Sequence, residues 1–257
     1  KRKRCFNDDI QGTAAIVLAA IMTALRYKNE CISQQRIVLV GPGAAGMGIV
    51  ESIQHYLKMK ISKDQKAEDQ IWLVGRDGLI TSDNCTDDEV KGYAKSSAQL
   101  KDWQGRELSE VVKRVKPTIL IGVTGQGGLF SDEILTTLTE AVDSPVILPL
   151  SNPSLKSECI PERVMEITDN KVFIATGSPF TVQVGDKRQS VSQCNNIFAF
   201  PGLAAGMYAS KCHYLSQDMI IAASNRISKY TIDKHGQSEK ITPELEDLQE
   251  VSKEVAE

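Results

Sequence analysis

The chain has 257 residues, of which 41% are hydrophobic and 25% charged, with a formal net charge of -3. This length accommodates one large α/β domain or two small ones, and the composition allows a substantial core without disulfides. A slightly acidic chain lacks the basic surplus of nucleic-acid-binding domains, so we expect no nucleic-acid partner. The one basic cluster, at residues 1–4, predicts a solvated flank, with a localisation signal as the alternative.

The cysteines and the apolar segments indicate where in the cell the protein is expected. Six cysteines are scattered without a C-x-x-C pair, as is typical of reduced thiols in an intracellular protein. The chain has no continuous run of about 18 apolar residues and no secretory signal, so we expect no membrane partner and a cytoplasmic location. It begins without a methionine, close to a motif described below, which indicates a fragment of a longer polypeptide.

The first patterned segment joins two aspartates to an apolar helix. Residues 14–25 are nearly all Ala, Ile, Val, Leu and Met, which predicts a helix buried on most sides. Asp8 and Asp9 lie at or just before its N-terminus. Helix capping accounts for one aspartate in such a place, but not for two in succession beside a glycine and a threonine.

A glycine cluster follows the next apolar run. Residues 37–40 predict a strand, and Val50, Ile53 and Leu57 recur at helical spacing after the glycines. A G-x-G-x-x-G between a strand and a helix is typical of dinucleotide binding, and a glycine-rich turn without a ligand is the alternative. The expected cofactor contacts are Gly41 for the tight turn, Gly43 for approach of the pyrophosphate, Gly46 for close helix packing, and Ala44 and Ala45 between them.

Four further strands are expected, at residues 71–74, 119–123, 146–150 and 172–175. They are continuously apolar and alternate with helical segments, so the sequence predicts an α/β fold: a doubly wound, Rossmann-type parallel sheet with helices on both faces. Polar residues end several strands, and ligands bind at that edge of such sheets. The polar residues expected to converge there are Thr124, Ser151, Asn152 and Ser178. We expect Thr124, Gly125 and Asn152, together with Arg76 after the second strand, to contact the cofactor. Closing helices are expected at 218–230 and 243–256.

Several stretches together resemble the malic enzyme family. They are FNDDIQGTA at 6–14, ILIGVTGQGGLF at 119–130, LSNP at 150–153, ATGSPF at 175–180, and Asn195-Asn196 ahead of the Phe-Pro-Gly at 200–202. The resemblance runs over nearly the whole chain. It implies an oxidoreductase that oxidises L-malate with NAD or NADP and decarboxylates the product to pyruvate and CO₂, using Mg²⁺ or Mn²⁺.

The resemblance also implies roles for particular residues. Asp9 is similar to a metal ligand, and Asp8 to the carboxylate that hydrogen-bonds the catalytic lysine. Asn152 and Asn195 are similar to asparagines that bind malate and lie by the nicotinamide, with Asn196 beside them. Thr13 and the glycine loop match cofactor contacts. The chemistry is consistent, since hard divalent cations prefer carboxylate oxygens and amides can orient a carboxylate without adding charge.

Two departures from the family pattern matter. The catalytic tyrosine and lysine, the substrate arginine and a Glu-Asp pair of the metal site lie upstream of the aspartate motif in the family. We therefore expect all 257 residues to form the NAD(P)-binding domain, the catalytic N-terminal region to be supplied by the rest of the polypeptide, and the chain alone to be inactive. The second strand ends in Gly75 instead of the ribose-binding aspartate, followed by Arg76 and Asp77. Because Arg can pair with a 2′-phosphate, the choice between NAD and NADP stays open.

Two alternatives to a malic enzyme remain from the sequence. A malolactic-type enzyme, which makes lactate with bound NAD, shares these motifs. A non-catalytic dinucleotide-binding module would need neither the two aspartates nor the asparagines. The family resemblance further implies a homo-oligomer.

Overall fold

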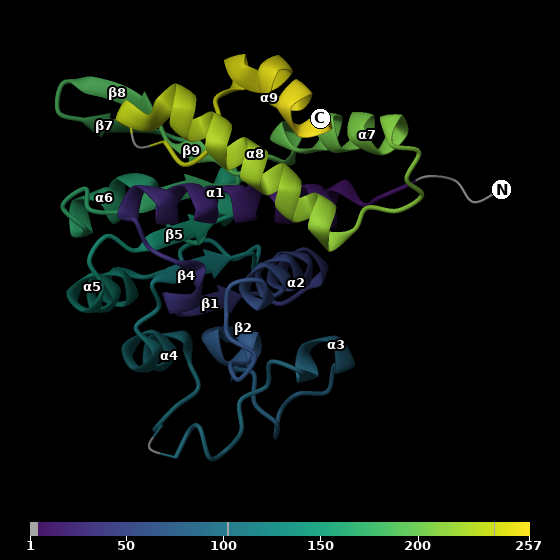
Figure 1. Cartoon of the computed structure of the whole chain (residues 1–257). Coiled ribbons are helices and arrows are strands. Elements are labelled where there is room, and N and C mark those ends of the chain that lie inside the picture. Colours follow the sequence, from purple (N-terminus) through teal and green to yellow (C-terminus); the bar gives the residue numbers. More distant parts are fainter. Residues whose placement is uncertain (1–4, 102, 239) are drawn as a thin grey trace.

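The computed structural model describes residues 5–101, 103–238 and 240–257, so the basic cluster at residues 1–4 lies outside the described residues. Its centre is a seven-stranded sheet in the order β3-β2-β1-β4-β5-β6-β9 (Figure 1). Of the described pairings in this sheet, only β2 with β3 is antiparallel. The sheet strands are β1 Ile37–Val40, β2 Ile71–Gly75, β3 Gly78–Leu79, β4 Ile119–Gly122, β5 Val146–Pro149, β6 Phe173–Thr176 and β9 Ser192–Gln193.

The strand order reverses between β1 and β4, and the two strands pair in parallel from Ile37 beside Ile119 to Val40 beside Gly122. At such a point the loops after the two strands turn to opposite faces and leave a crevice between them. The predicted doubly wound sheet is therefore confirmed, and β1, β2, β4, β5 and β6 lie where the apolar runs place them, whereas the two-residue strands β3 and β9 were not predicted. A hairpin of β7 Thr181–Val184 and β8 Lys187–Ser190 was not predicted.

Two hydrophobic cores lie on opposite faces of the sheet. Alternate residues of one strand enter different cores: Ile37 and Leu39 face α1 Thr13–Lys28, α2 Ala44–Lys58 and α8 Gln217–His235. Val38 and Val40 face α4 Leu108–Val115, α5 Asp132–Ala141 and α6 Pro161–Ile167 (Figure 1). This period of two, with both faces apolar, explains why the strands are continuously apolar in sequence.

The long apolar helix α1 is the innermost helix of the structure. Residues 14–25 are all buried, and α8 packs across them. Although it contains no unbroken apolar run of that length, Asp8–Lys28 reaches the length and hydropathy of a membrane span, but 72% of its apolar 18-residue window is buried by the rest of the described chain. Burial of this kind is what a core helix shows.

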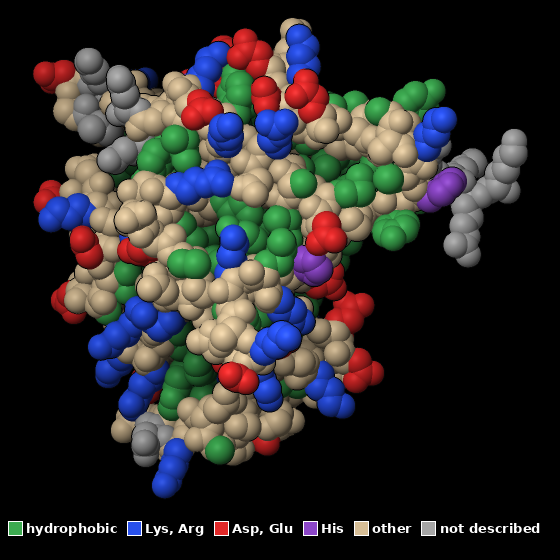
Figure 2. Space-filling view, viewed as in Figure 1, with side chains coloured by type: hydrophobic (Ala, Val, Ile, Leu, Met, Phe, Trp, Pro, Cys, Tyr) green, Lys and Arg blue, Asp and Glu red, His purple; other side chains and the backbone are tan. Residues whose placement is uncertain are grey.

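The remaining helices are α3 Asp88–Lys91, α7 Phe200–Ala209 and α9 Leu248–Ala256, with a π-helical turn, η1 Asp8–Gly12, before α1 and a 3₁₀ turn, η5 Asn196–Phe198, before α7. They lie at opposite ends of the molecule, α3 at one and α7 and α9 at the other (Figure 1). α7 was not predicted, and α9 begins five residues later than expected, after a 3₁₀ turn at Leu245–Asp247. Figure 2 shows Lys and Arg together with Asp and Glu on the visible face of the described residues.

Candidate dinucleotide and acid sites

The three glycines of the loop after β1 each meet a different constraint. Gly41 has a φ of +93°, and a Cβ there would lie 2.6 Å from the carbonyl oxygen of Val123. A Cβ on Gly46 would lie 2.4 Å from the carbonyl oxygen of Gly41. A Cβ on Gly43 would meet nothing within 4 Å. Two glycines are thus required by the fold, whereas Gly43 is required only if something else approaches the loop.

The N-terminus of α2 opens onto that free space. Gly43 is its N-cap, in extended conformation, and no side chain of the described residues caps the helix. The N–H groups of Ala44, Ala45 and Gly46 have no intrahelical acceptor, as in the first turn of any α-helix. With the helix dipole behind them, these donors form an anion site suited to a pyrophosphate.

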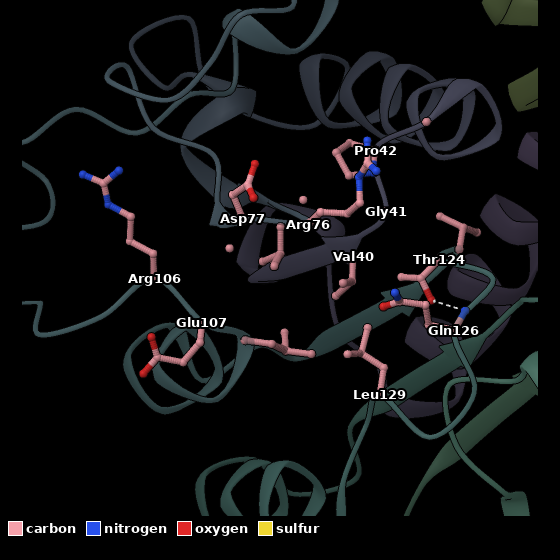
Figure 3. A pocket seen from close by; sticks show the side chains of 16 residues that line it. Val40, Gly41, Pro42, Arg76, Asp77, Arg106, Glu107, Thr124, Gln126 and Leu129 are labelled. Carbon is pink, nitrogen blue, oxygen red and sulfur yellow. Dashed lines mark hydrogen bonds between the residues drawn. The ribbon is translucent and has the colours of Figure 1, made fainter.

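A cavity of about 750 Å³ lies beside this loop, in the size range of cofactor pockets. Its wall combines Gly41 and Gly43 with the β2–β3 turn, residues 106–108 and the loop after β4 (Figure 3). Thr124 and Gln126 come from that last loop, and the Gln126 N–H donates to Thr124 Oγ1 at 3.0 Å. The cavity therefore spans the crevice at which the strand order reverses.

Four of the expected cofactor residues line this cavity: Gly41, Gly43, Arg76 and Thr124. Six others lie outside its wall: Thr13, Ala44, Ala45, Gly46, Gly125 and Asn152. Thr13 begins α1, and its N–H donates to the carbonyl of Asp8. Asn152 follows β5 and accepts a hydrogen bond from the Ser178 hydroxyl. Their roles stay predictions.

The turn between β2 and β3 closes the far end of the cavity. Gly75 ends β2, and the exposed Arg76 and Asp77 form the turn. The Arg76 side chain extends toward Pro42 of the glycine loop in Figure 3. Arg106, also in the wall, pairs with Asp83 at 3.4 Å. The wall at this end therefore combines two guanidinium groups with the carboxylates of Asp77 and Glu107, and position 75 itself carries no carboxylate.

A second cluster lies where η1 meets η5. The Asn196 Nδ2 donates to Asp8 Oδ2 at 2.6 Å, which joins the first and last motifs of the sequence across 188 positions. Asp8 Oδ1 is buried and has no hydrogen-bond partner among the described residues. Burial, and then the neighbouring Asp9 charge, raises the pKa of the Asp8 carboxyl above its ordinary value. A buried acceptor left without a donor is costly, so this atom indicates an interaction still to be made.

The neighbouring Asp9 and Asn195 do not take part in this contact. Asp9 is exposed, and its backbone N–H donates to Asn7 Oδ1 at 3.0 Å. Asn195 uses its Oδ1 to accept from the Ile197 N–H at 3.0 Å and so caps η5. No group of three or more His, Cys, Asp or Glu residues able to hold a metal occurs within the described ranges. The Asp9 carboxylate fits one position of a hard-cation site, but the described chain does not complete a coordination shell.

One buried acidic residue was missed by the sequence analysis. Glu158 is completely buried, and its carboxylate accepts from Thr124 and Ser151, on the loops after β4 and β5. Its sequence position, between a 3₁₀ turn and α6, carries no motif. The related sequence feature is the glycine at position 122, at the end of β4. Its lack of a side chain leaves room for Glu158, since a Cβ there would lie 2.6 Å from the Glu158 side chain.

The doubly wound sheet, the glycine loop and the crevice together define a dinucleotide-binding domain of the Rossmann type. Comparison with known proteins narrows this class. Residues 10–257 match the family described as the NAD-binding domain of malic enzyme, and the chain belongs to that family.

Named relatives agree with this assignment. The chain is 40% identical over 261 residues to an NAD-dependent malic enzyme of Pseudomonas aeruginosa and 38% identical over 259 residues to one of Acinetobacter baylyi, covering 98% of this chain in both. A crystal structure of an NAD-dependent malic enzyme from Thermotoga maritima superposes with a TM-score of 0.72 at 25% identity, covering 98% of this chain and 58% of that one. The chain spans 46% of the length of the two curated relatives.

Proposed function

We propose that this chain is the dinucleotide-binding domain of a malic enzyme that oxidises L-malate with NAD(P) and decarboxylates it to pyruvate and CO₂. The observation that carries the proposal is the contact between Asp8 and Asn196, in a turn that packs against α2, with Asp8 Oδ1 left without a donor among the described residues. A sensor that only binds a dinucleotide has no use for an aspartate held in this state. An acid-base site does, because a buried carboxylate can orient a neighbouring basic side chain and favour its protonated form.

The chain's own residues divide the work. The N–H groups of Ala44, Ala45 and Gly46 bind the pyrophosphate, and bound NAD(P) supplies the hydride acceptor at the crevice. Asp8 Oδ1 accepts a hydrogen bond from a lysine of the remaining polypeptide, while Asn196 holds Oδ2 and fixes the carboxylate plane. This arrangement keeps a proton donor and acceptor near the substrate carbon skeleton.

Substrate and metal contacts extend this proposal. Asn152, Asn195 and Asn196 offer amide groups that can bind a malate carboxylate without adding charge. Asp9 supplies one carboxylate to Mg²⁺ or Mn²⁺, and the rest of the polypeptide supplies the others; the cation would polarise the substrate carbonyl. Asp9→Ala in the full-length polypeptide should abolish Mn²⁺-dependent turnover, measured as NAD(P)H formation across a Mn²⁺ titration. Activity close to wild type at low Mn²⁺ would remove Asp9 from the metal site.

Cofactor preference is a finer part of the proposal. The relatives are named NAD-dependent, which favours NAD for this chain. Gly75 neither bonds a ribose 2′-hydroxyl nor repels a 2′-phosphate, and Arg76 lies next to it. We therefore propose a domain that uses NAD with weak discrimination against NADP.

A full-length assay with product analysis tests the proposal. Malate, NAD or NADP and Mn²⁺ should give pyruvate with stoichiometric NAD(P)H. Lactate without net NAD(P)H would establish the malolactic alternative instead. Binding of NAD(P) with neither product would leave a non-catalytic module. We extend the proposal to a homo-oligomer in the cytoplasm, and the free state of all six cysteines agrees with a reducing compartment.

A further inference from the structure

Glu158 is a buried carboxylate outside the expected site. It lies between η4 Ser154–Lys156 and α6, with no solvent exposure, and its side chain rests on Gly122 at the end of β4. Backbone bonds fix its position, since the Phe130 N–H donates to the Glu158 carbonyl at 2.8 Å. A charge in this position is costly unless donors surround it.

The donors come from two loops that end neighbouring strands. The Thr124 N–H and hydroxyl each donate to Glu158 Oε1 at 2.8 Å, from the loop after β4. The Ser151 hydroxyl donates to Oε1 at 2.5 Å, and the Ser151 N–H to Oε2 at 3.3 Å, from the loop after β5. No Lys, Arg or His of the described residues pairs with Glu158. One carboxylate therefore joins two loops through hydrogen bonds alone.

The carboxylate also sets the direction of the next hydrogen bonds. An ionised carboxylate only accepts, so both hydroxyls must point their protons at Glu158 and keep their lone pairs for the loop. The Ser151 hydroxyl accepts from the Gly125 N–H at 2.8 Å, and the Thr124 hydroxyl accepts from the Gln126 N–H at 3.0 Å. The conformation of residues 124–126 thus depends on a group that accepts and does not donate.

These loops face the proposed ligands. Thr124 and Gln126 line the dinucleotide cavity, and Ser151 directly precedes Asn152. We propose that Glu158 is a positioning residue that holds the loops after β4 and β5 in the conformation that binds the dinucleotide. This inference rests on the proposed function only in so far as the crevice binds NAD(P); it does not require malate to be the substrate.

The test is Glu158→Gln in the full-length polypeptide. The amide keeps the shape and one acceptor oxygen, but it turns an N–H₂ group toward the Ser151 N–H, so donor faces donor. Because hydrogen bonds to charged groups are the strong ones, we expect the Kd for NADH to rise about tenfold. NADH fluorescence measures this Kd without malate. The control is Glu162→Gln, an exposed glutamate in the first turn of α6, which should leave the Kd unchanged.

A second variant keeps the test decisive if Glu158→Gln does not fold. Ser151→Ala leaves the carboxylate but removes the hydroxyl that links it to the Gly125 N–H, and it should also weaken NADH binding. If both variants fold, their effects on the Kd should be less than additive, since they break one network.

The result that would overturn the inference is a changed melting temperature with Kd values for NADH and NADPH within about twofold of wild type in every variant that folds. Glu158 would then support the fold only. A separate assay of the wild-type polypeptide with malate tests the proposed function. Absent turnover with a shifted Kd in Glu158→Gln would reject malate and retain Glu158 as the positioning residue.

Discussion

The glycine loop and the Asp8–Asn196 cluster are neighbours in the structure, because η1 packs against α2, yet they differ in completeness. The loop has its turn, its close packing and its free helix N–H groups in place without any further part. Among the described residues, the cluster has a buried carboxylate oxygen with no donor, and its two aspartates belong to no group of three or more His, Cys, Asp or Glu able to hold a metal. Under the proposed function, groups of this chain bind the dinucleotide, whereas the chemistry also uses groups from the rest of the polypeptide.

The largest expected effect comes from the incomplete cluster. Asp8→Asn in the full-length polypeptide keeps the hydrogen bond from Asn196 but removes the charge that would orient a lysine. Acid-base groups of this kind contribute about 10²–10⁴ in rate, so we expect kcat to fall at least about 100-fold. The Kd for NADH should stay at its wild-type value. The control is Asp64→Asn, in an exposed loop; a kcat near wild type for Asp8→Asn would show that the cluster is not catalytic.

The raised pKa of Asp8 gives this variant a second consequence. Because the pKa of the Asp8 carboxyl is higher in the folded than in the unfolded chain, the folded state loses stability as the pH rises from the unfolded-state pKa through the folded-state pKa. Above this pH range, Asp8 is ionised in the folded state, where burial and the neighbouring Asp9 disfavour its negative charge. Asp8→Asn should therefore raise the melting temperature of this chain at pH 7 while it lowers turnover of the whole enzyme. The two melting temperatures should converge as the pH falls below the ordinary Asp range; a lower value for the variant at pH 7 would contradict this account.

The complete site is tested at the one loop glycine that the fold does not require. Gly43→Val places a branched side chain where a Cβ meets no atom within 4 Å, so the fold should tolerate it. It would occupy the path of the pyrophosphate, and we expect the Kd for NADH to rise by at least about tenfold. Gly92→Val is the matched control, since a Cβ there also meets nothing within 4 Å and the residue is outside the cavity wall. Equal Kd values for the two variants would refute the assignment of the loop.

The smallest expected effect concerns the far end of the cavity. Gly75→Asp in the full-length polypeptide introduces the carboxylate that bonds a ribose and repels a 2′-phosphate. We expect the ratio of kcat/KM for NAD over NADP to rise about tenfold. A Cβ there lies 3.2 Å from Ile80 Cδ1, which must move slightly. Gly75→Asn has the same shape as Gly75→Asp without the charge. It therefore separates hydrogen bonding to the ribose from electrostatic repulsion of the 2′-phosphate. A ratio unchanged within about twofold would place residue 75 away from the ribose.

Features set by local pattern were predictable from the sequence. The strand at Ile37–Val40 follows from an apolar run. The need for glycine at Gly41, for the turn, and at Gly46, for close helix packing, follows from the spacing of a strand, a turn and a helix. The depth of α1 was predictable from its lack of a polar face. In each case neighbouring residues contain the information.

Features set by distant contacts were not predictable in the same way. The bond between Asp8 and Asn196 joins residues 188 positions apart, and only the family resemblance placed both near a site. Glu158 has no motif, and its role depends on two loops that the sheet brings together. α7 was missed because it begins with Phe-Pro-Gly, which is typical of a turn.

The most direct test compares this chain alone with the full-length polypeptide. Both should be titrated with NADH, and both assayed for malate-dependent reduction of NAD and NADP with Mn²⁺. We expect the isolated chain to bind the dinucleotide weakly and to turn over no malate, while the full-length polypeptide does both. Reduction of NAD(P) by malate with the isolated chain would contradict the account, because the Asp8–Asn196 cluster would then be complete without further groups.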